Sequence, residues 1–222
     1  MVILTRYIEP NWKRSVLITI DTQNDFSVVG SKAEVPGTAE ILPKMKQLVD
    51  AFRTAKRPII HVIRLYKPDG TNADLCRREM IENGFHFVIP DTDGAELVNE
   101  IKPDPCPPLR GDLLLNGEFQ QLGEYDWAMY KPRWGAFYQT DLEEFLIQKG
   151  IDTLIFAGCN FPNCPRTSMY EASERDLKVV MTGDAISGVY EKGFEEMRNI
   201  GVSVLESNEI INKLNCKNRT QK

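Results

Sequence analysis

One strand-to-helix step in the second half of the chain is the most informative stretch for the fold: Thr153-Leu-Ile-Phe-Ala-Gly-Cys-Asn-Phe-Pro-Asn-Cys164. Its first five residues, 153–157, are apolar and predict a buried strand, and residues 168–176 have the composition of a helix. A cysteine at such a turn lies near backbone N–H groups and a helix N-terminus, which lowers a thiol pKa. The pattern predicts a reactive thiolate at Cys164, although an isolated cysteine is more often an inert core residue.

Strands and helices alternate on both sides of this step. Apolar runs predict further strands at 15–20, 58–63, 126–130, 178–182 and 202–205. Helical spacing predicts helices at 38–55, 95–101, 140–149 and 191–199, with Gly150 as a C-cap. This rhythm predicts an α/β fold, a doubly wound, Rossmann-like three-layer sandwich with a mostly parallel sheet. We expect one domain at 14–210, between an N-terminal extension (1–13) and a polar C-terminal tail (211–222).

Length, charge and cysteine usage exclude several classes of protein. The 222 residues fit one large domain, and a formal charge of −5 does not favour a nucleic-acid partner. No apolar run is long enough to span a membrane, and the N-terminus does not resemble a secretory signal. Five cysteines without a CxxC pair indicate free thiols in a reducing compartment. We therefore expect a cytoplasmic protein with neither a nucleic-acid nor a membrane partner.

The two histidines and the irregular region 66–124 complete this survey. His61 falls within a predicted strand and is expected in the core, and His86 is expected in a loop. Two histidines cannot build a multi-histidine metal site, so we expect no metal and no other cofactor. Region 66–124 is long for a plain connection and is expected to be a functional loop or lid.

Two distant residues stand in the same place as Cys164 relative to a predicted strand. Asp21 follows the strand at 15–20, and Lys131 follows the strand at 126–130. Because ligands bind beyond the carboxyl ends of parallel strands, the three side chains converge on one crevice if their strands are neighbours. Aspartate can accept and return a proton, and lysine can stabilise a thiolate. Singly, Asp21 is more often a turn residue and Lys131 a surface charge, so the combination carries the prediction.

Four segments, in this order, resemble the isochorismatase-like cysteine hydrolase superfamily. They are Ile20-Asp-Thr-Gln-Asn-Asp-Phe26, Tyr130-Lys-Pro-Arg-Trp-Gly-Ala-Phe137, Gly158 to Cys164, and Met181-Thr-Gly-Asp-Ala185. The resemblance implies a nucleophile at Cys164, with Asp21 and Lys131 completing a catalytic triad. It also implies a cis peptide at Cys159–Asn160 and an oxyanion hole made by the backbone N–H groups of Asn160 and Cys164. The resemblance further implies a homodimer or homotetramer.

The substrate class follows from the same resemblance. The segment from Arg64 to Asp74 is similar to the branch of N-carbamoylsarcosine amidohydrolases. This implies hydrolysis of a non-peptide C–N bond in a small amide, carbamoyl or ureido compound through a thioester. Cys164 argues against hydrolysis of the isochorismate enol ether, since the members that catalyse it lack the cysteine. Neither histidine follows an Asp-x pattern, which argues against a metal-dependent nicotinamidase.

Four residues are candidates for substrate binding. Arg64 and Arg166 could clamp a substrate carboxylate by bidentate hydrogen bonds, although a solvated arginine is the commoner case. Phe26 and Trp134 could form an apolar pocket wall, at even odds with ordinary core packing.

The cysteine turn departs from the common family form, which leaves other functions open. Many members have Thr, Asp and Val at the positions of Phe161, Pro162 and Pro165. The alternative is a catalytically silent scaffold of the same fold that binds a small molecule or a protein partner. A nucleotide-binding domain is not favoured because no Gly-x-Gly-x-x-Gly follows the first strand. A redox role is not favoured without a CxxC pair, although Cys159 could lie near Cys164.

Overall fold

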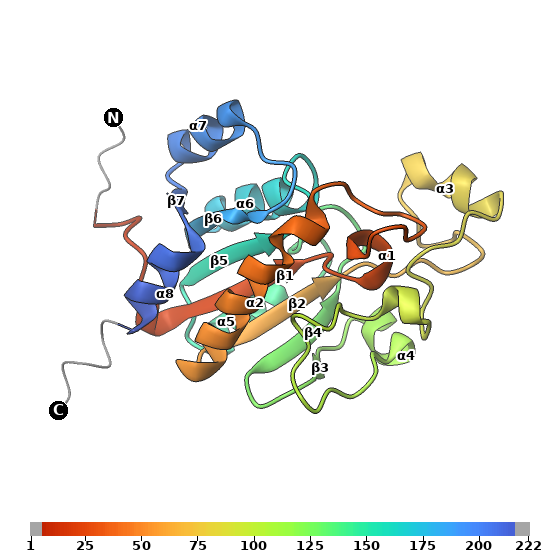
Figure 1. Cartoon of the computed structure of the whole chain (residues 1–222), viewed down its shortest axis with the longest axis horizontal. Coiled ribbons are helices and arrows are strands. Elements are labelled where there is room, and N and C mark those ends of the chain that lie inside the picture. The colour runs from red at the N-terminus through yellow and green to blue at the C-terminus, as the bar shows by residue number, and fades with distance from the viewer. Residues whose placement is uncertain (1–5, 216–222) are drawn as a thin grey trace.

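Seven strands form one sheet in the computed structural model, which describes residues 6–215 (Figure 1). They are β1 (Ser15–Ile20), β2 (Ile59–Ile63), β3 (Gln120–Gln121), β4 (Asp126–Tyr130), β5 (Thr153–Gly158), β6 (Lys178–Ile186) and β7 (Ser203–Leu205). The order in the sheet is β3-β4-β2-β1-β5-β6-β7, and only the pair β3–β4 is antiparallel. Without β3, this is the Rossmann strand order, so the predicted doubly wound α/β fold is confirmed.

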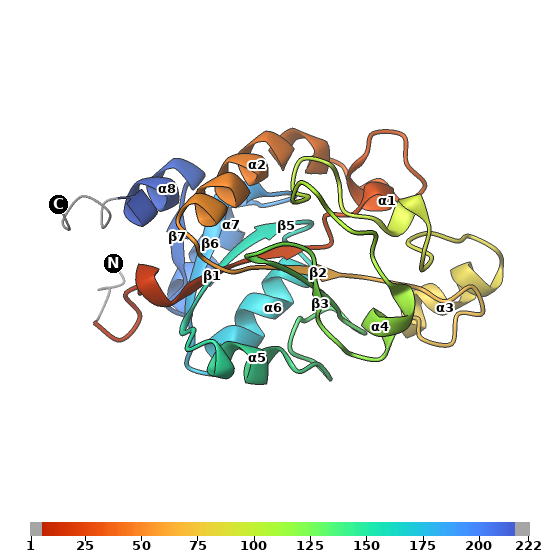
Figure 2. The ribbon, with the colours of Figure 1, turned by 90° about the horizontal axis from the view of Figure 1, so that it is seen from below.

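Helices cover both faces of the sheet, as Figure 2 shows. They are α1 (Asn24–Ser27), α2 (Thr38–Thr54), α3 (Leu75–Glu82), α4 (Gly111–Leu115), α5 (Leu142–Gln148), α6 (Cys164–Ser173), α7 (Glu191–Asn199) and α8 (Ser207–Asn215), with 3-10 turns η1 (Trp12–Arg14) and η2 (Asp93–Ala95). The apolar side chains of α2 and α8 share one core, and those of α5, α6 and α7 share the other. The sheet between these two layers completes the predicted three-layer sandwich.

The central strand β1 shows how the sequence builds both cores. Leu17 packs into the core under α2, and Val16 and Ile18 pack into the opposite core. Successive side chains of a strand point to opposite faces, so a strand covered on both sides is apolar at nearly every position. Each fully buried aliphatic side chain of this kind stabilises the fold by about 1.5–3 kcal/mol.

Two expectations about secondary structure are wrong. No helix forms at 95–101, where η2 ends at Ala95 and Leu97 instead forms an antiparallel bridge with Gln23. Helix α6 begins at Cys164 itself, four residues before the expected start. The first error arises because the buried residues of this stretch are packed by tertiary contacts, which helical spacing alone does not reveal.

The expected polar tail at 211–222 is also partly wrong. Residues 211–215 complete α8, whose Leu214 is buried in the core beneath α2. Residues 216–222, like residues 1–5 of the expected extension, lie outside the described part of the chain. The extent of a single domain at 14–210 stays a prediction.

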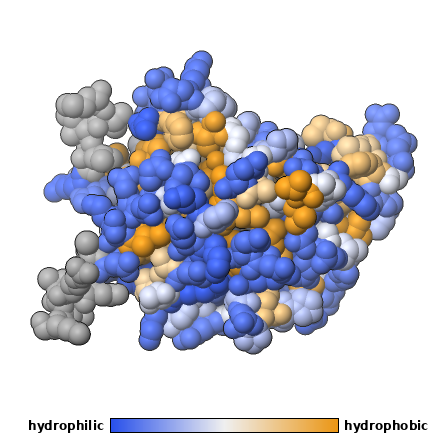
Figure 3. All heavy atoms as spheres, viewed as in Figure 1, coloured by the Kyte–Doolittle hydropathy of each residue, from blue (hydrophilic) through white to orange (hydrophobic). Residues whose placement is uncertain are grey.

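The face of the molecule in Figure 3 is mainly hydrophilic. Hydrophobic atoms gather on it in separate patches, one of them over α1 and the loop that follows, where Val28 and Val29 are exposed. Between residues 6 and 215, no helix has the length and apolar character needed to cross a membrane.

Candidate active site

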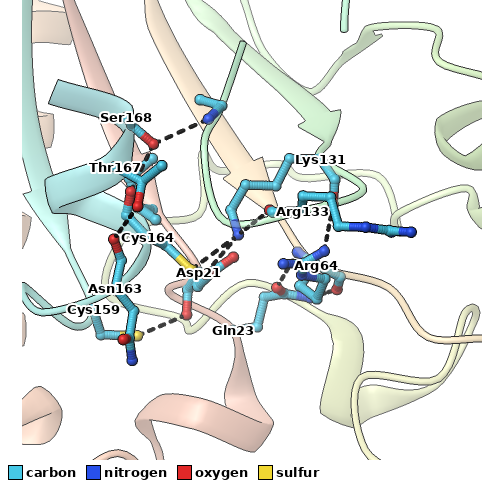
Figure 4. A network of polar contacts seen from close by, with 12 residues as sticks. Asp21, Gln23, Arg64, Lys131, Arg133, Cys159, Asn163, Cys164, Thr167 and Ser168 are labelled. Atoms are coloured by element: carbon cyan, nitrogen blue, oxygen red, sulfur yellow. Dashed lines mark hydrogen bonds and ion pairs between the residues drawn. The ribbon is translucent and has the colours of Figure 1, made fainter. Parts of the chain in front are cut away.

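The ends of β1, β4 and β5 bring Asp21, Lys131 and Cys164 together (Figure 4). Lys131 Nζ donates a hydrogen bond to Asp21 Oδ2 at 2.9 Å and lies 3.2 Å from Cys164 Sγ. All three residues are buried, and Lys131 is 0% exposed. β1 and β5 are neighbours whose following helices, α2 and α6, cover opposite faces of the sheet. The cluster therefore occupies the point where the winding of the fold reverses, the usual ligand site of an open α/β sheet.

A close contact between β1 and β5 fixes the direction of the Asp21 side chain. Gly158 has a φ of +116°, and a Cβ there would lie 2.2 Å from the carbonyl oxygen of Ile20, so only glycine fits. The next residue, Cys159, donates its N–H to Ile20 O at 2.9 Å and its thiol to Asp21 O at 3.1 Å. Asp21 itself has a φ of +50°, which turns the chain away from the strand direction. The backbone that carries the carboxylate is thus held from the neighbouring strand.

The turn between β5 and α6 leaves two backbone N–H groups free. The Cys159–Asn160 peptide is cis. Phe161 N–H donates to Ser187 O, Asn163 N–H donates to Asn160 O, and Pro162 has no N–H. The N–H groups of Asn160 and Cys164 have no acceptor among the described residues. Cys164 is the first residue of α6, where backbone N–H groups have no partner within the helix, so these groups can bind a negatively charged oxygen.

The resting thiol does not have the lowered pKa that its place in the sequence predicts. Burial, followed by the charge of Asp21, raises the pKa of Cys164 to about 11, against the opposing charge of Lys131. The expectation of a resting thiolate is therefore wrong, because desolvation of the charged form outweighs the helix N-terminus. Asp21 Oδ1 is buried without a hydrogen-bond partner among the described residues, so it is available to receive the thiol proton.

Arg64 lies at the edge of this cluster and is 1% exposed. Its Nη1 donates to Lys131 O at 3.2 Å, and its Nη2 lies 3.5 Å from the carboxylate of Asp74. The buried amide of Gln23 holds the Arg64 backbone by bonding both its N–H and its C=O, at 2.8 and 2.9 Å. Gln23 in turn follows Asp21 by two residues, so the end of β1 positions Arg64 as well as the carboxylate.

The other predicted binding residues lie in different surroundings. Phe26 is buried in the core under α2, edge-on to Phe87, whereas Trp134 is half-buried and faces the Arg64 guanidinium. Arg166 points to α7, where it pairs with Glu196 at 2.8 Å and bonds the hydroxyl of Tyr190. Its charge is already neutralised by that carboxylate, so the expectation of a substrate clamp at Arg166 is not supported.

Sequence reasoning missed Arg77 on α3. Its guanidinium carbon lies 4.8 Å from the centre of the Trp134 ring, and its Nη1 donates to the Tyr66 hydroxyl at 2.7 Å. No helix was expected at 75–82 because this stretch has little apolar periodicity. The one available signal is Asp74, a residue type favoured at the start of a helix.

His61 is a structural residue, as expected. It is fully buried in β2, with Nδ1 2.8 Å from Thr19 Oγ1 and Nε2 3.1 Å from Asp126 Oδ1. Burial lowers the pKa of its imidazole, so it is neutral in the fold. Both ring nitrogens are occupied and cannot bind a metal. From residue 6 to residue 215, no group of three His, Cys, Asp or Glu side chains could hold a metal ion.

Comparisons with known proteins give the same family as the motifs. The isochorismatase domain family model matches residues 15–209. A protein of Arabidopsis thaliana described as a probable inactive nicotinamidase is 30% identical over 197 residues, covering 86% of this chain and 91% of that protein. A ureidoacrylate amidohydrolase of Methylorubrum extorquens is 24% identical over 206 residues, covering 84% of this chain and 75% of that protein.

Comparison with a solved structure indicates the same family. The isochorismatase family protein from Desulfovibrio vulgaris superposes with a TM-score of 0.76 at 28% identity, covering 90% of this chain and 98% of that chain. The family model spans most of the described chain, including the ends of all three strands that carry the cluster. The chain therefore belongs to the isochorismatase family, in its isochorismatase-like cysteine hydrolase group.

Proposed function

We propose that this protein hydrolyses a non-peptide C–N bond in a small amide, carbamoyl or ureido compound, with Cys164 as the nucleophile. One observation carries the proposal: beyond the ends of three strands, a buried ammonium lies 2.9 Å from a buried carboxylate and 3.2 Å from a buried thiol. A nucleophile, a base beside it and a cation that balances their charges are what acyl transfer to a thiol requires. The amidohydrolase named among the relatives carries out chemistry of this class.

In the first half of the reaction, Asp21 Oδ1 takes the proton of the Cys164 thiol as Sγ bonds to the substrate carbonyl carbon. Because the thiol pKa of about 11 lies well above neutrality, this transfer accompanies attack rather than preceding it. The carbonyl oxygen becomes an oxyanion, which the N–H groups of Asn160 and Cys164 stabilise. Asp21 then returns the proton to the leaving nitrogen, the C–N bond breaks, and ammonia or an amine departs.

In the second half, Asp21 takes a proton from a water molecule as the water oxygen bonds to the thioester carbon. The C–S bond breaks, and the proton returns to Sγ. An amide gives a carboxylic acid. A carbamoyl compound gives a carbamate that breaks down to carbon dioxide and the nitrogen that did not leave in the first half, as an amine if ammonia left and as ammonia if the amine left. Lys131 balances the charge of the Asp21 carboxylate between the two transfers, since its ammonium is 2.9 Å from Oδ2.

The test combines turnover with detection of the intermediate. Ammonia release is measured on a panel of primary amides, N-carbamoyl compounds and ureas, with wild type, Cys164→Ala and Cys76→Ala. Cys76 is an exposed thiol and serves as the matched control. We expect Cys76→Ala to match wild type and Cys164→Ala to lose at least about 10³-fold in kcat. Rapid quenching and mass spectrometry should show an acyl adduct on the peptide that contains Cys164. Full turnover by Cys164→Ala would remove the nucleophile assignment.

A catalytically silent scaffold remains the second candidate. The high thiol pKa and the Phe161-Pro162 turn favour it, as does the resemblance to a plant protein described as probably inactive. Folded wild-type protein that releases no ammonia and forms no adduct with any compound of the panel would select this function. The homodimer or homotetramer and the cytoplasmic location stay predictions.

A further inference from the structure

Two guanidinium groups lie together beside the candidate nucleophile. Arg64 and Arg77 both face the rings of Tyr66 and Trp134, with guanidinium carbons 5.5 and 5.8 Å from the Tyr66 centre and 5.9 and 4.8 Å from the Trp134 centre. The four side chains, called the arginine–aromatic cluster below, come from the chain after β2, from α3 and from the chain after β4. The rings occupy the faces of the guanidiniums and leave their N–H edges for other partners.

The charges of this cluster do not balance. Lys131 pairs with Asp21, and Arg64 is near Asp74 at 3.5 Å, a contact too long to be a strong ion pair. Arg77 is half-buried and pairs with no carboxylate of the described residues. Three cations therefore share two carboxylates, which leaves one positive charge. A half-buried cation without a carboxylate partner has lost part of its hydration, and an anion that enters the site would offset that loss.

Donors for such an anion are free as well. Arg64 Nε is buried with no hydrogen-bond partner among the described residues. The Arg77 fork uses Nη1 to bond the Tyr66 hydroxyl and has further N–H groups to offer. Although burial by itself lowers the pKa of the Arg77 guanidinium, the hydrogen bond to Tyr66 and the charge of Asp21 are among the causes that raise it. Arg77 therefore stays charged within electrostatic reach of the nucleophile.

We propose that Arg64 and Arg77 bind a carboxylate of the substrate, so that this enzyme acts on an anionic ureido or amide acid in preference to an uncharged amide. This inference rests on the proposed function, because the carboxylate has to lie beside the carbonyl that Cys164 attacks. Arg77, which the sequence did not single out, supplies the unpaired charge and is the specificity-determining residue. Asp74, held by the Tyr66 hydroxyl at 2.7 Å, orients Arg64.

The test uses two compounds of similar size and different charge. N-carbamoylglycine carries a carboxylate where isobutylurea carries two methyl groups. Ammonia release is measured for wild type, Arg77→Gln, Arg77→Lys and Arg110→Gln. Arg110 is an exposed arginine paired with Asp112 and serves as the matched control. Arg64 is left in place because it is buried and bonds the main chain of Lys131.

We expect wild type and Arg110→Gln to prefer the acid by at least about 10-fold in kcat/KM. Arg77→Gln should lose about 10- to 100-fold on the acid, the range for hydrogen bonds to a charged group, and less than about 3-fold on isobutylurea. Arg77→Lys should recover part of the loss. Equal losses on both compounds, or a wild type without preference for the acid, would overturn the inference and leave the proposed function standing.

Binding separates this inference from the reaction. N-carbamoylglycine is titrated calorimetrically into Cys164→Ala and into Cys164→Ala with Arg77→Gln. A dissociation constant that rises at least about 10-fold in the double variant supports the anion site, even if no compound is turned over and the proposed function fails. Equal affinity in the two proteins would overturn it.

Discussion

Replacing Asp21 by Asn should make the Cys164 thiol more reactive and the enzyme less active. The Asp21 charge raises the pKa of the thiol, and the Lys131 ammonium, 3.2 Å from Sγ, lowers it. The substitution removes the negative charge and leaves Lys131 without its carboxylate partner, so the thiolate becomes the natural counterion of the ammonium. The same substitution removes the group that carries the proton in the proposed reaction.

The expected sizes of the rise in thiolate fraction and of the fall in kcat can both be estimated. With a pKa of about 11, about one thiol in a thousand is ionised at pH 8. Loss of a nearby like charge lowers a pKa by about 1–3 units, so the thiolate fraction at pH 8 should rise about 10- to 500-fold. Loss of a positioned general acid and base should lower kcat by about 10²- to 10⁴-fold.

The assay is the rate of iodoacetamide alkylation of each cysteine between pH 7 and 10, read by peptide mass spectrometry, beside ammonia release. Asp50→Asn is the matched control, since Asp50 is an exposed carboxylate paired with Lys46 on α2. Far-ultraviolet circular dichroism establishes that the variants are folded. Slower alkylation of Cys164 in Asp21→Asn, or undiminished turnover, would refute these effects of the two charges on the thiol.

Three further predictions follow from the same structure. Lys131→Met should act on the thiol in the opposite direction, raising the Cys164 pKa and slowing its alkylation at pH 8, while turnover also falls; faster alkylation would contradict the role of the ammonium. Gly158→Ala should lower the free energy of unfolding by at least about 3 kcal/mol, because the added Cβ would lie 2.2 Å from the Ile20 carbonyl oxygen. Gly117, with φ +89° and open space around it, is the control, and Gly117→Ala should lower the free energy of unfolding by only about 1–2 kcal/mol. Urea denaturation measures both. The buried, neutral His61 has a lowered pKa, so the unfolded state binds more protons near its ordinary pKa of 6.5, and stability should fall as the pH drops through and below that value. Denaturation at pH 7.5 and 5.5 should show a smaller pH effect in His61→Gln than in wild type.

The sequence predicts the sheet well because a doubly wound sheet leaves a strong local signal. Strands buried on both faces, such as β1 and β5, are continuous apolar runs whose limits can be read directly. The turn residues at their carboxyl ends are then placed by topology, which is why Asp21, Lys131 and Cys164 could be grouped before the fold was known. Helix α2 likewise shows its buried face in the spacing of Met45, Leu48 and Phe52.

What the sequence misses depends on contacts between distant segments. Arg77 lies on a helix with only one buried side chain, Ile81, so periodicity does not detect it. The stretch 95–101 has helical spacing, yet the Gln23 side chain bonds Ala95 O at 2.7 Å and holds the stretch in another conformation. The thiol pKa was predicted with the wrong sign because burial and the approach of Asp21 belong to the assembled site and have no local signature.

The strand order that assembles the site also sets when it can exist during folding. Asp21 and Cys164 follow neighbouring strands, β1 and β5, that are separated in the chain by about three-fifths of its length. β2 lies between β1 and β4, so Lys131 reaches Asp21 only after two parallel pairings have formed. Pairings of such large sequence separation are slow, because the loops between them must close first. On the ribosome, Asp21 and Lys131 are both synthesised before their thiol partner. The nascent chain therefore lacks the assembled cluster of Asp21, Lys131 and Cys164 until β5 pairs with β1 at the centre of the sheet.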